Sequence, residues 1–173
     1  MAIPNSRREV RMAQRRCLLI CTACSFLCVV AGLAAQTLQI IHTDGQSTTV
    51  TAAQIANSPH VTVNVKTHDV PAQFEGVPLA TLLSIAGIQL GDRLRGPRLT
   101  EALMVEAADG YKVIFALAEI DPAFATREII LADQRDGKPL DAKEGPFRIV
   151  VPGDKRPARW ARQVTTLRLL AVK

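Results

Sequence analysis

Outside its apolar N-terminal run, this sequence keeps a helical hydrophobic period for no more than about a dozen residues at a time. Short segments with the two-residue alternation of strands recur instead, separated by turn-forming pairs such as Asp136-Gly137 and Pro152-Gly153. The pattern predicts an α+β fold, in which a β-rich domain with mixed sheets carries two or three short helices.

The first 35 residues differ in composition from the rest of the chain. Five arginines and one glutamate lie within the first sixteen residues, residues 17–33 carry no charge, and a cluster of mainly small residues, AGLAA, follows at 31–35. These are the three parts of a secretory signal peptide, so we expect cleavage after Ala34 or Ala35. The apolar run is just short of the roughly 18 to 20 residues that cross a bilayer. An uncleaved N-terminal anchor is the alternative, and only then would the membrane be a partner.

All four cysteines lie in that segment, at Cys17, Cys21, Cys24 and Cys28. The remaining chain, residues 36–173, therefore has no disulfide, thiolate zinc site or cysteine nucleophile. It has the length of one domain and shows no repeat or linker, so we predict a single periplasmic or secreted domain over residues 36–173. Of the net charge of +5, +4 belongs to the first sixteen residues (five arginines less one glutamate). The near-neutral remainder argues against a nucleic-acid partner.

Several elements can be placed from local patterns. Thr51 and Gln54 form a capping box that begins a short helix ending before Pro59. Pro78 and Gly87 bracket a second helix, and a third is expected at residues 117–120. Strands are expected at residues 38–43, 61–66, 103–107, 111–116, 128–132, 147–151 and 163–172, with Asp109-Gly110 as a hairpin turn.

Few residues of the mature chain offer catalytic or metal-binding chemistry. Its serines stand outside any Gly-x-Ser-x-Gly motif, and its three histidines, His42, His60 and His68, lack the short spacing of a zinc site. We interpret His60 and His68 as the polar side of a solvated strand, and we predict no metal ligand.

A basic cluster near the end of the chain is the clearest candidate binding site. It comprises Arg148, Lys155, Arg156, Arg159 and Arg162, opposed within that segment only by Asp154. Guanidinium groups beside the turn amides of Pro152-Gly153 suit the oxygens of a phosphate. The alternative is a solvated loop balanced by acidic residues, namely Asp133, Asp136, Asp141 and Glu144, with Trp160 as a core anchor.

The succession of several short blocks resembles a known family. The blocks are FEGVPLATLL at 74–83, ADGY at 108–111, LA at 131–132, DGKPL at 136–140, EGPFRIVVPG at 144–153 and RW at 159–160. In order and spacing they are similar to the molybdopterin-binding domain of the sulfite oxidase family, over roughly residues 50–170. The resemblance implies an α+β domain with a β-rich core, in which a molybdenum atom on a pyranopterin dithiolene transfers oxygen atoms.

The resemblance also implies which residues bind the cofactor. In the family, the turn after the Val-Val-Pro-Gly strand and the following Lys-Trp pair help to hold the pterin and its phosphate. This implies that Arg148, Lys155, Arg156 and Arg159 contact molybdopterin or another anionic small molecule, with Arg159 in place of the usual lysine. For Asp109 and Tyr111 we expect a structural role in the hairpin.

One departure from the family concerns the metal. Catalytic members bind molybdenum through a cysteine before the Gly-Val-Pro-Leu block, and here that segment, residues 65–70, reads VKTHDV. A centre that prefers soft donors would be poorly served by His68 or Asp69, so we do not expect bound molybdenum.

Three functions stay open at this point. The first is an exported domain that has lost oxygen-atom transfer and serves as a binding or accessory module. The second is an active molybdopterin-dependent oxidoreductase that uses a non-cysteine ligand or a partner subunit. The third is a structural domain of the cell envelope that interacts with a protein partner.

Overall fold

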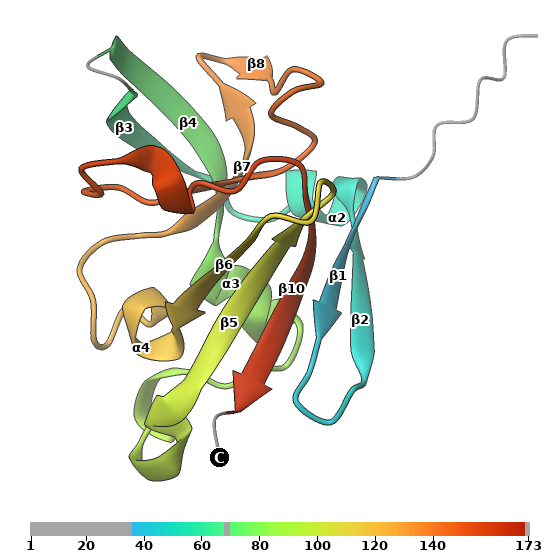
Figure 1. Ribbon diagram of the computed structural model, residues 1–173, viewed down its shortest axis with the longest axis vertical. Coiled ribbons are helices and arrows are strands. Elements are labelled where there is room, and N and C mark those ends of the chain that lie inside the picture. Colours follow the sequence, from blue (N-terminus) through green and yellow to red (C-terminus); the bar gives the residue numbers. More distant parts are fainter. Residues whose placement is uncertain (1–35, 68–69, 172–173) are drawn as a thin grey trace, which may run out of the picture. The chain divides into compact units, whose positions relative to one another are not determined.

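The computed structural model describes residues 36–67 and 70–171, which form two β-sheets and short helices (Figure 1). The segment predicted to be a signal peptide or anchor, residues 1–35, lies outside the described residues, as do His68 and Asp69. Within the described ranges, none of the helices has the length and hydropathy of a membrane span.

The first sheet, sheet A, contains both ends of the described domain. Its strand order is β2-β1-β10-β5-β6. The strands are β1 (Thr37–Ile41), β2 (Ser47–Thr51), β5 (Glu101–Ala107), β6 (Lys112–Ala116) and β10 (Val164–Ala171). β1 runs parallel to β10, whereas the other described pairs of this sheet are antiparallel. β1, β5 and β6 bury alternate residues, such as Leu38 and Ile40 of β1, as the two-residue period requires.

The second sheet, sheet B, is antiparallel throughout the pairs that the structure describes. Its strands are β3 (Val61–Thr67), β4 (Val70–Pro78), β7 (Ile130–Arg135), β8 (Lys138–Pro139) and β9 (Arg148–Val150). β9 pairs with β7, so the start of the Arg-Ile-Val-Val-Pro-Gly segment lies inside this sheet. The predicted alternation of β3 is confirmed, because its valines are half-buried and the polar residues between them are exposed.

The described residues also form three short α-helices, which confirm the predicted α+β class. They are α2 (Ala52–Ala56), α3 (Leu79–Ile85) and α4 (Leu117–Ile120), accompanied by the 3-10 turns η1 (Gly91–Arg93), η2 (Gly96–Thr100) and η3 (Pro157–Arg159). The predicted capping box is present at α2, where Thr51 and Gln54 bond each other's backbone N–H groups. α3 buries Leu79, Leu82 and Leu83 in one apolar cluster that includes residues of both sheets.

A close approach between β4 and β7 depends on a glycine. A Cβ atom on Gly76 would lie 2.2 Å from the backbone oxygen of Leu131, so no larger residue fits there without a backbone shift. The register also shifts at this point, since Glu75 pairs with Gln134 and Gly76 with Ala132. Asp133 is the extra residue of the resulting bulge.

The bulge brings Asp133 to His60. The ring Nε2 of His60 lies 3.2 Å from Asp133 Oδ2, and Nδ1 lies 2.7 Å from the backbone oxygen of Ser58. The side chain of His60 is only 21% exposed, and the residue precedes β3 instead of lying on it. The interpretation of His60 as part of a solvated strand face is therefore wrong, because a carboxylate far away in sequence covers its ring. For His68 that interpretation falls outside the described residues.

Candidate functional site

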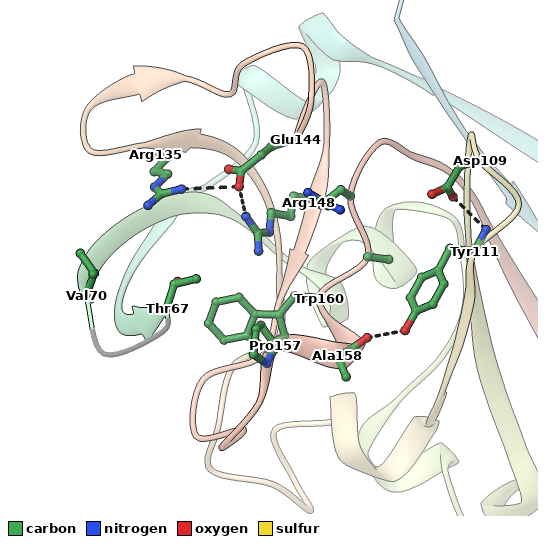
Figure 2. Close-up of a pocket in the computed structure, with 12 residues that line it drawn as sticks. Thr67, Val70, Asp109, Tyr111, Arg135, Glu144, Arg148, Pro157, Ala158 and Trp160 are labelled. Atoms are coloured by element: carbon green, nitrogen blue, oxygen red, sulfur yellow. Dashed lines mark hydrogen bonds and ion pairs between the residues drawn. The ribbon is translucent and has the colours of Figure 1, made fainter.

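A cleft of about 700 Å³ lies where sheet B meets the segment that follows β9. Three arginines line it, Arg135, Arg148 and Arg162, and we call it the arginine cleft. Its other walls include Thr67 at the end of β3, Tyr111 beside the β5–β6 turn, and Trp160 directly after η3 (Figure 2).

Arg148 is a buried cation at the base of this cleft, with 5% of its surface exposed. Its guanidinium carbon lies 5.2 Å from the centre of the Phe74 ring and 5.6 Å from that of the Trp160 ring. Burial lowers the pKa of Arg148, and the neighbouring Glu144 carboxylate opposes that shift. Because an arginine titrates so far above neutrality, the side chain stays charged.

Glu144 connects two of the arginines. Its Oε1 atom accepts a hydrogen bond from Nη1 of Arg148 and lies 3.5 Å from Nη1 of Arg135. Arg162 is exposed in the same cleft. Three arginines face two acidic residues, Glu144 and Asp109, so the lining carries a net charge of 3 − 2 = +1. The cleft is therefore electrostatically suited to an anion.

The β5–β6 turn is tied to η3 across one side of the arginine cleft. The hydroxyl of Tyr111 donates a hydrogen bond of 2.6 Å to the backbone oxygen of Ala158, and Asp109 accepts one from the Tyr111 N–H (Figure 2). Gly110 has a φ of +84°, which a side chain would strain. The predicted hairpin is confirmed, and the contact between Tyr111 and Ala158 joins it to the basic segment.

A second cleft, of about 680 Å³, shares Trp160 with the first. It is lined by Lys66, Lys155 and Arg156, and we call it the lysine cleft. All three cations are exposed, and none has a carboxylate partner among the described residues. Asp154, which also lines this cleft, is engaged by Arg159 and Arg127.

Arg159 lies in an ion network instead of in either cleft lining. Its Nε and Nη2 atoms donate to Asp154 at 3.0 and 2.8 Å, and Nη1 donates to Glu119 at 3.0 Å. Arg127 contacts the same two carboxylates, at 2.8 Å for Glu119 and 3.6 Å for Asp154. The hydrogen bond to Asp154, despite some burial, raises the pKa of Arg159. This arginine therefore connects α4 to the loop that carries Lys155 and Arg156.

The structure thus separates the four predicted cofactor-binding residues. Arg148 lines the arginine cleft, Lys155 and Arg156 line the lysine cleft, and Arg159 is held by carboxylates. Sequence reasoning did not select Arg135 or Thr67, which come from β7 and β3 and reach the cleft only through the folding of sheet B. Among the residues that the structure describes, no group of three acidic, histidine or cysteine side chains could hold a metal ion.

Comparison with solved structures places this fold beside a known enzyme. The sulfane dehydrogenase SoxCD from Paracoccus pantotrophus superposes with a TM-score of 0.62 at 19% sequence identity, over 82% of this chain and 40% of that chain. This likeness concerns the fold, and this chain spans about two fifths of the length of that one. No curated protein matches the sequence closely enough to count as a relative.

The family comparison covers most of the chain. Residues 46–172 match the model described as "Oxidoreductase molybdopterin binding domain". This range contains both sheets except β1, all three helices, and every residue named in the two clefts. The chain accordingly belongs to the family of oxidoreductase molybdopterin-binding domains.

Proposed function

We propose that this protein is an exported member of its family that binds an anionic small molecule in the arginine cleft and does not transfer oxygen atoms. One observation carries the proposal. The segment at which catalytic members supply a thiolate, residues 65–70, contributes Thr67 and Val70 to the arginine cleft and contains no cysteine. Residues 65–70 therefore lack the thiolate that binds the metal in catalytic members, whereas the buried cation Arg148 lies in the same cleft.

Molybdopterin, when bound, supplies oxygen-atom transfer at a molybdenum atom that also takes a protein sulfur ligand. None of the described residues lining the arginine cleft carries sulfur, and their polar atoms are nitrogen and oxygen. A soft metal centre prefers thiolate over such hard donors. The residues present therefore do not fit the molybdenum centre.

The same residues do fit the anionic part of a ligand. Arginine forks match phosphate and carboxylate oxygens, and the buried Arg148 is less screened by water than a surface arginine. Tyr111 lines the same cleft and exposes an aromatic ring on which a planar group such as a pterin can stack, whereas Trp160 is a buried part of the wall. A binding or accessory role follows from this combination.

Metal analysis tests the loss of redox chemistry. Protein produced in a host that makes molybdopterin should contain far less than equimolar molybdenum, and mass spectrometry of the small molecules released on unfolding should identify an anionic ligand. Equimolar molybdenum in the purified protein would contradict the proposal.

Export is the second part of the proposal. It is supported by the arginine-rich start, the uncharged run and the small residues at 31–35. N-terminal sequencing of protein from the envelope fraction should begin at Ala35 or Gln36. A start at Met1 would favour the uncleaved anchor.

A second candidate function is an oxidoreductase completed by a partner subunit in the envelope. It is motivated by the match to an oxidoreductase domain model together with the lack of a cysteine in residues 65–70, since a partner could then supply the missing metal ligand. Molybdenum that co-purifies with a native complex and is lost when the partner is removed would favour it. If the protein is instead a structural envelope domain, purification from the envelope should recover a protein partner. Substitutions in the arginine cleft should then change no small-molecule binding.

A further inference from the structure

One histidine fastens the connection between the two sheets. Residues 57–60 lead from α2, which follows β2 of sheet A, to β3 of sheet B, and His60 is the last of them. Its Nδ1 atom lies 2.7 Å from the backbone oxygen of Ser58, and its Nε2 atom lies 3.2 Å from Oδ2 of Asp133 in the β7 bulge. A single imidazole ring therefore joins this connection to a residue 73 positions further along the chain.

The two contacts together specify the protonation state of the ring. Both partners, a backbone carbonyl and a carboxylate, accept hydrogen bonds and have no proton to donate. A neutral imidazole carries one N–H group and can donate to only one of them, whereas the imidazolium donates to both. The geometry therefore matches the charged ring.

The charges that face the ring favour the same state. Asp133 acts from β7 and Glu75 from β4, while the sequence of α2 contains no charged residue. Burial disfavours the charged ring, but the two hydrogen bonds and the two carboxylates outweigh burial, so the pKa of His60 is raised above 6.5. The ring is charged in acidic solution and loses its proton as the pH rises through the raised value.

Loss of that proton removes the hydrogen bond on which Asp133 depends. Its Oδ1 atom is buried without a partner, and among the described residues its Oδ2 atom is bonded only to His60. A neutral ring that keeps its shorter bond to Ser58 turns the Nε2 lone pair toward this carboxylate. A charged group that is mostly buried and unpaired is costly. A cleft of about 520 Å³ lies beside Asp133, so the carboxylate can turn away from the ring and be hydrated there.

We propose that His60 and Asp133 form a pH-sensitive clip, which holds residues 57–60 against the β7 bulge while the ring is charged and releases them when it is neutral. The clip goes beyond the proposed function, because neither residue lines the arginine cleft or the lysine cleft and neither a ligand nor export is needed for it. It has a route to the arginine cleft, since Arg135 follows Asp133 by two positions on β7 and lines that cleft.

An NMR titration of the purified protein from pH 5 to pH 9.5, which follows the ring nitrogens of His60, tests the clip without any substitution. We expect both nitrogens to be protonated at low pH and the midpoint to lie above 6.5. Asp133→Asn removes the carboxylate charge at nearly constant shape and should lower the midpoint. Glu75→Gln removes a group that acts only through its charge and should lower it less. A wild-type midpoint at or below 6.5, or an unchanged midpoint in Asp133→Asn, would overturn the proposal.

Hydrogen–deuterium exchange at pH 5.5 and pH 8.5, each corrected for the intrinsic exchange rate at that pH, tests the release itself. Around residues 57–61 and 132–135 the wild type should be about tenfold less protected at pH 8.5, whereas the protection of β10 should not change. Asp133→Asn should lose this dependence on pH. His42→Gln is the matched control and should open like the wild type, because the ring of His42 contacts the Thr48 hydroxyl. Equal protection of the wild type at both pH values would refute the clip.

Discussion

Guanidinium groups of the basic segment have different surroundings, and these decide what each can do. Arg148 is buried between two aromatic rings, Arg159 is held by two carboxylates, and Arg156 is exposed without a carboxylate partner among the described residues. A buried arginine binds an anion strongly because water screens it little, whereas an arginine that is already paired has fewer free donors. Arg148 is paired with Glu144 through Nη1 alone, whereas Arg159 uses Nε, Nη1 and Nη2, so the first keeps donors for a ligand and the second holds a loop in place.

Replacing Arg159 by alanine should therefore act mainly on stability. We expect a loss of about 1 kcal/mol in the free energy of unfolding, more than a single surface pair contributes, because the change breaks a network with Asp154 and Glu119. Arg156→Ala should change stability by less than about 0.5 kcal/mol. Urea denaturation at low and high salt measures both. If Arg159→Ala loses as much unfolding free energy in high salt as in low salt, the stabilisation by Arg159 is not electrostatic.

Gly76→Ala tests the close approach of β4 and β7. The added Cβ would meet Leu131 O at 2.2 Å and Ala132 Cα at 2.5 Å, both backbone atoms that cannot rotate away. We expect a loss of about 3 kcal/mol in unfolding free energy. Gly45→Ala is the control, since its Cβ meets nothing within 4 Å and only its φ of +85° opposes the change, at about 1 kcal/mol. Equal losses of unfolding free energy for the two variants would contradict the claim that close contact with the β7 backbone requires glycine at position 76.

At the scale of elements, the β5–β6 turn and η3 depend on each other. Tyr111→Phe keeps the ring but removes the hydroxyl that bonds the Ala158 oxygen. Because this tie joins two segments that are far apart in sequence, we expect faster hydrogen–deuterium exchange around residues 153–160. Global stability should fall by no more than about 1 kcal/mol. Ile114→Val, on the exposed side of β6, serves as the control, and equal exchange in the two variants would contradict the role of the tie.

Elements with strong local signals could be predicted from the sequence. The capping box of α2, the valine alternation of β3 and the Asp-Gly hairpin all rest on neighbours within a few residues, and all three are present. β4 was not predicted as a strand. It contains Pro71, Gly76 and Pro78, which weaken any local strand pattern, and it is held instead by pairing with β3 and β7 on its two sides.

The candidate site was predicted only in part, for a related reason. The basic residues were visible as a cluster, but whether each is free depends on partners far away in sequence, such as Glu119, 40 residues before Arg159. Arg135 and Thr67 gave no local signal, because sheet pairing alone brings them to the cleft. Glu144 was interpreted as a solvated counter-charge, whereas it contacts the buried Arg148 directly.

At the scale of the whole molecule, stability should depend on pH through His60. Burial lowers the pKa of this histidine, but hydrogen bonds to Ser58 O and Asp133 and the charges of Asp133 and Glu75 outweigh it, so the pKa is raised above its ordinary value of 6.5. The charged ring is then favoured in the folded state. Its contribution is complete below pH 6.5 and is lost as the pH rises through the raised value.

His60→Gln should consequently lose more stability at pH 5.5 than at pH 8.5, measured by urea denaturation at each pH. His42→Gln is the matched control, since the ring of His42 contacts the Thr48 hydroxyl and has no carboxylate partner among the described residues. The difference between the two pH values should be larger for His60→Gln than for His42→Gln. A pH-independent loss for His60→Gln would contradict the ion pair with Asp133.

The parallel pairing of β1 with β10 has a consequence for when the domain can fold. β1 begins at Thr37 and its neighbour β10 ends at Ala171, so the middle of sheet A joins the two ends of the described domain. A chain that is made from its N-terminus must hold β1 unpaired on that side until β10 has been made. Until then β1 presents a free strand edge, and sheet A stays incomplete.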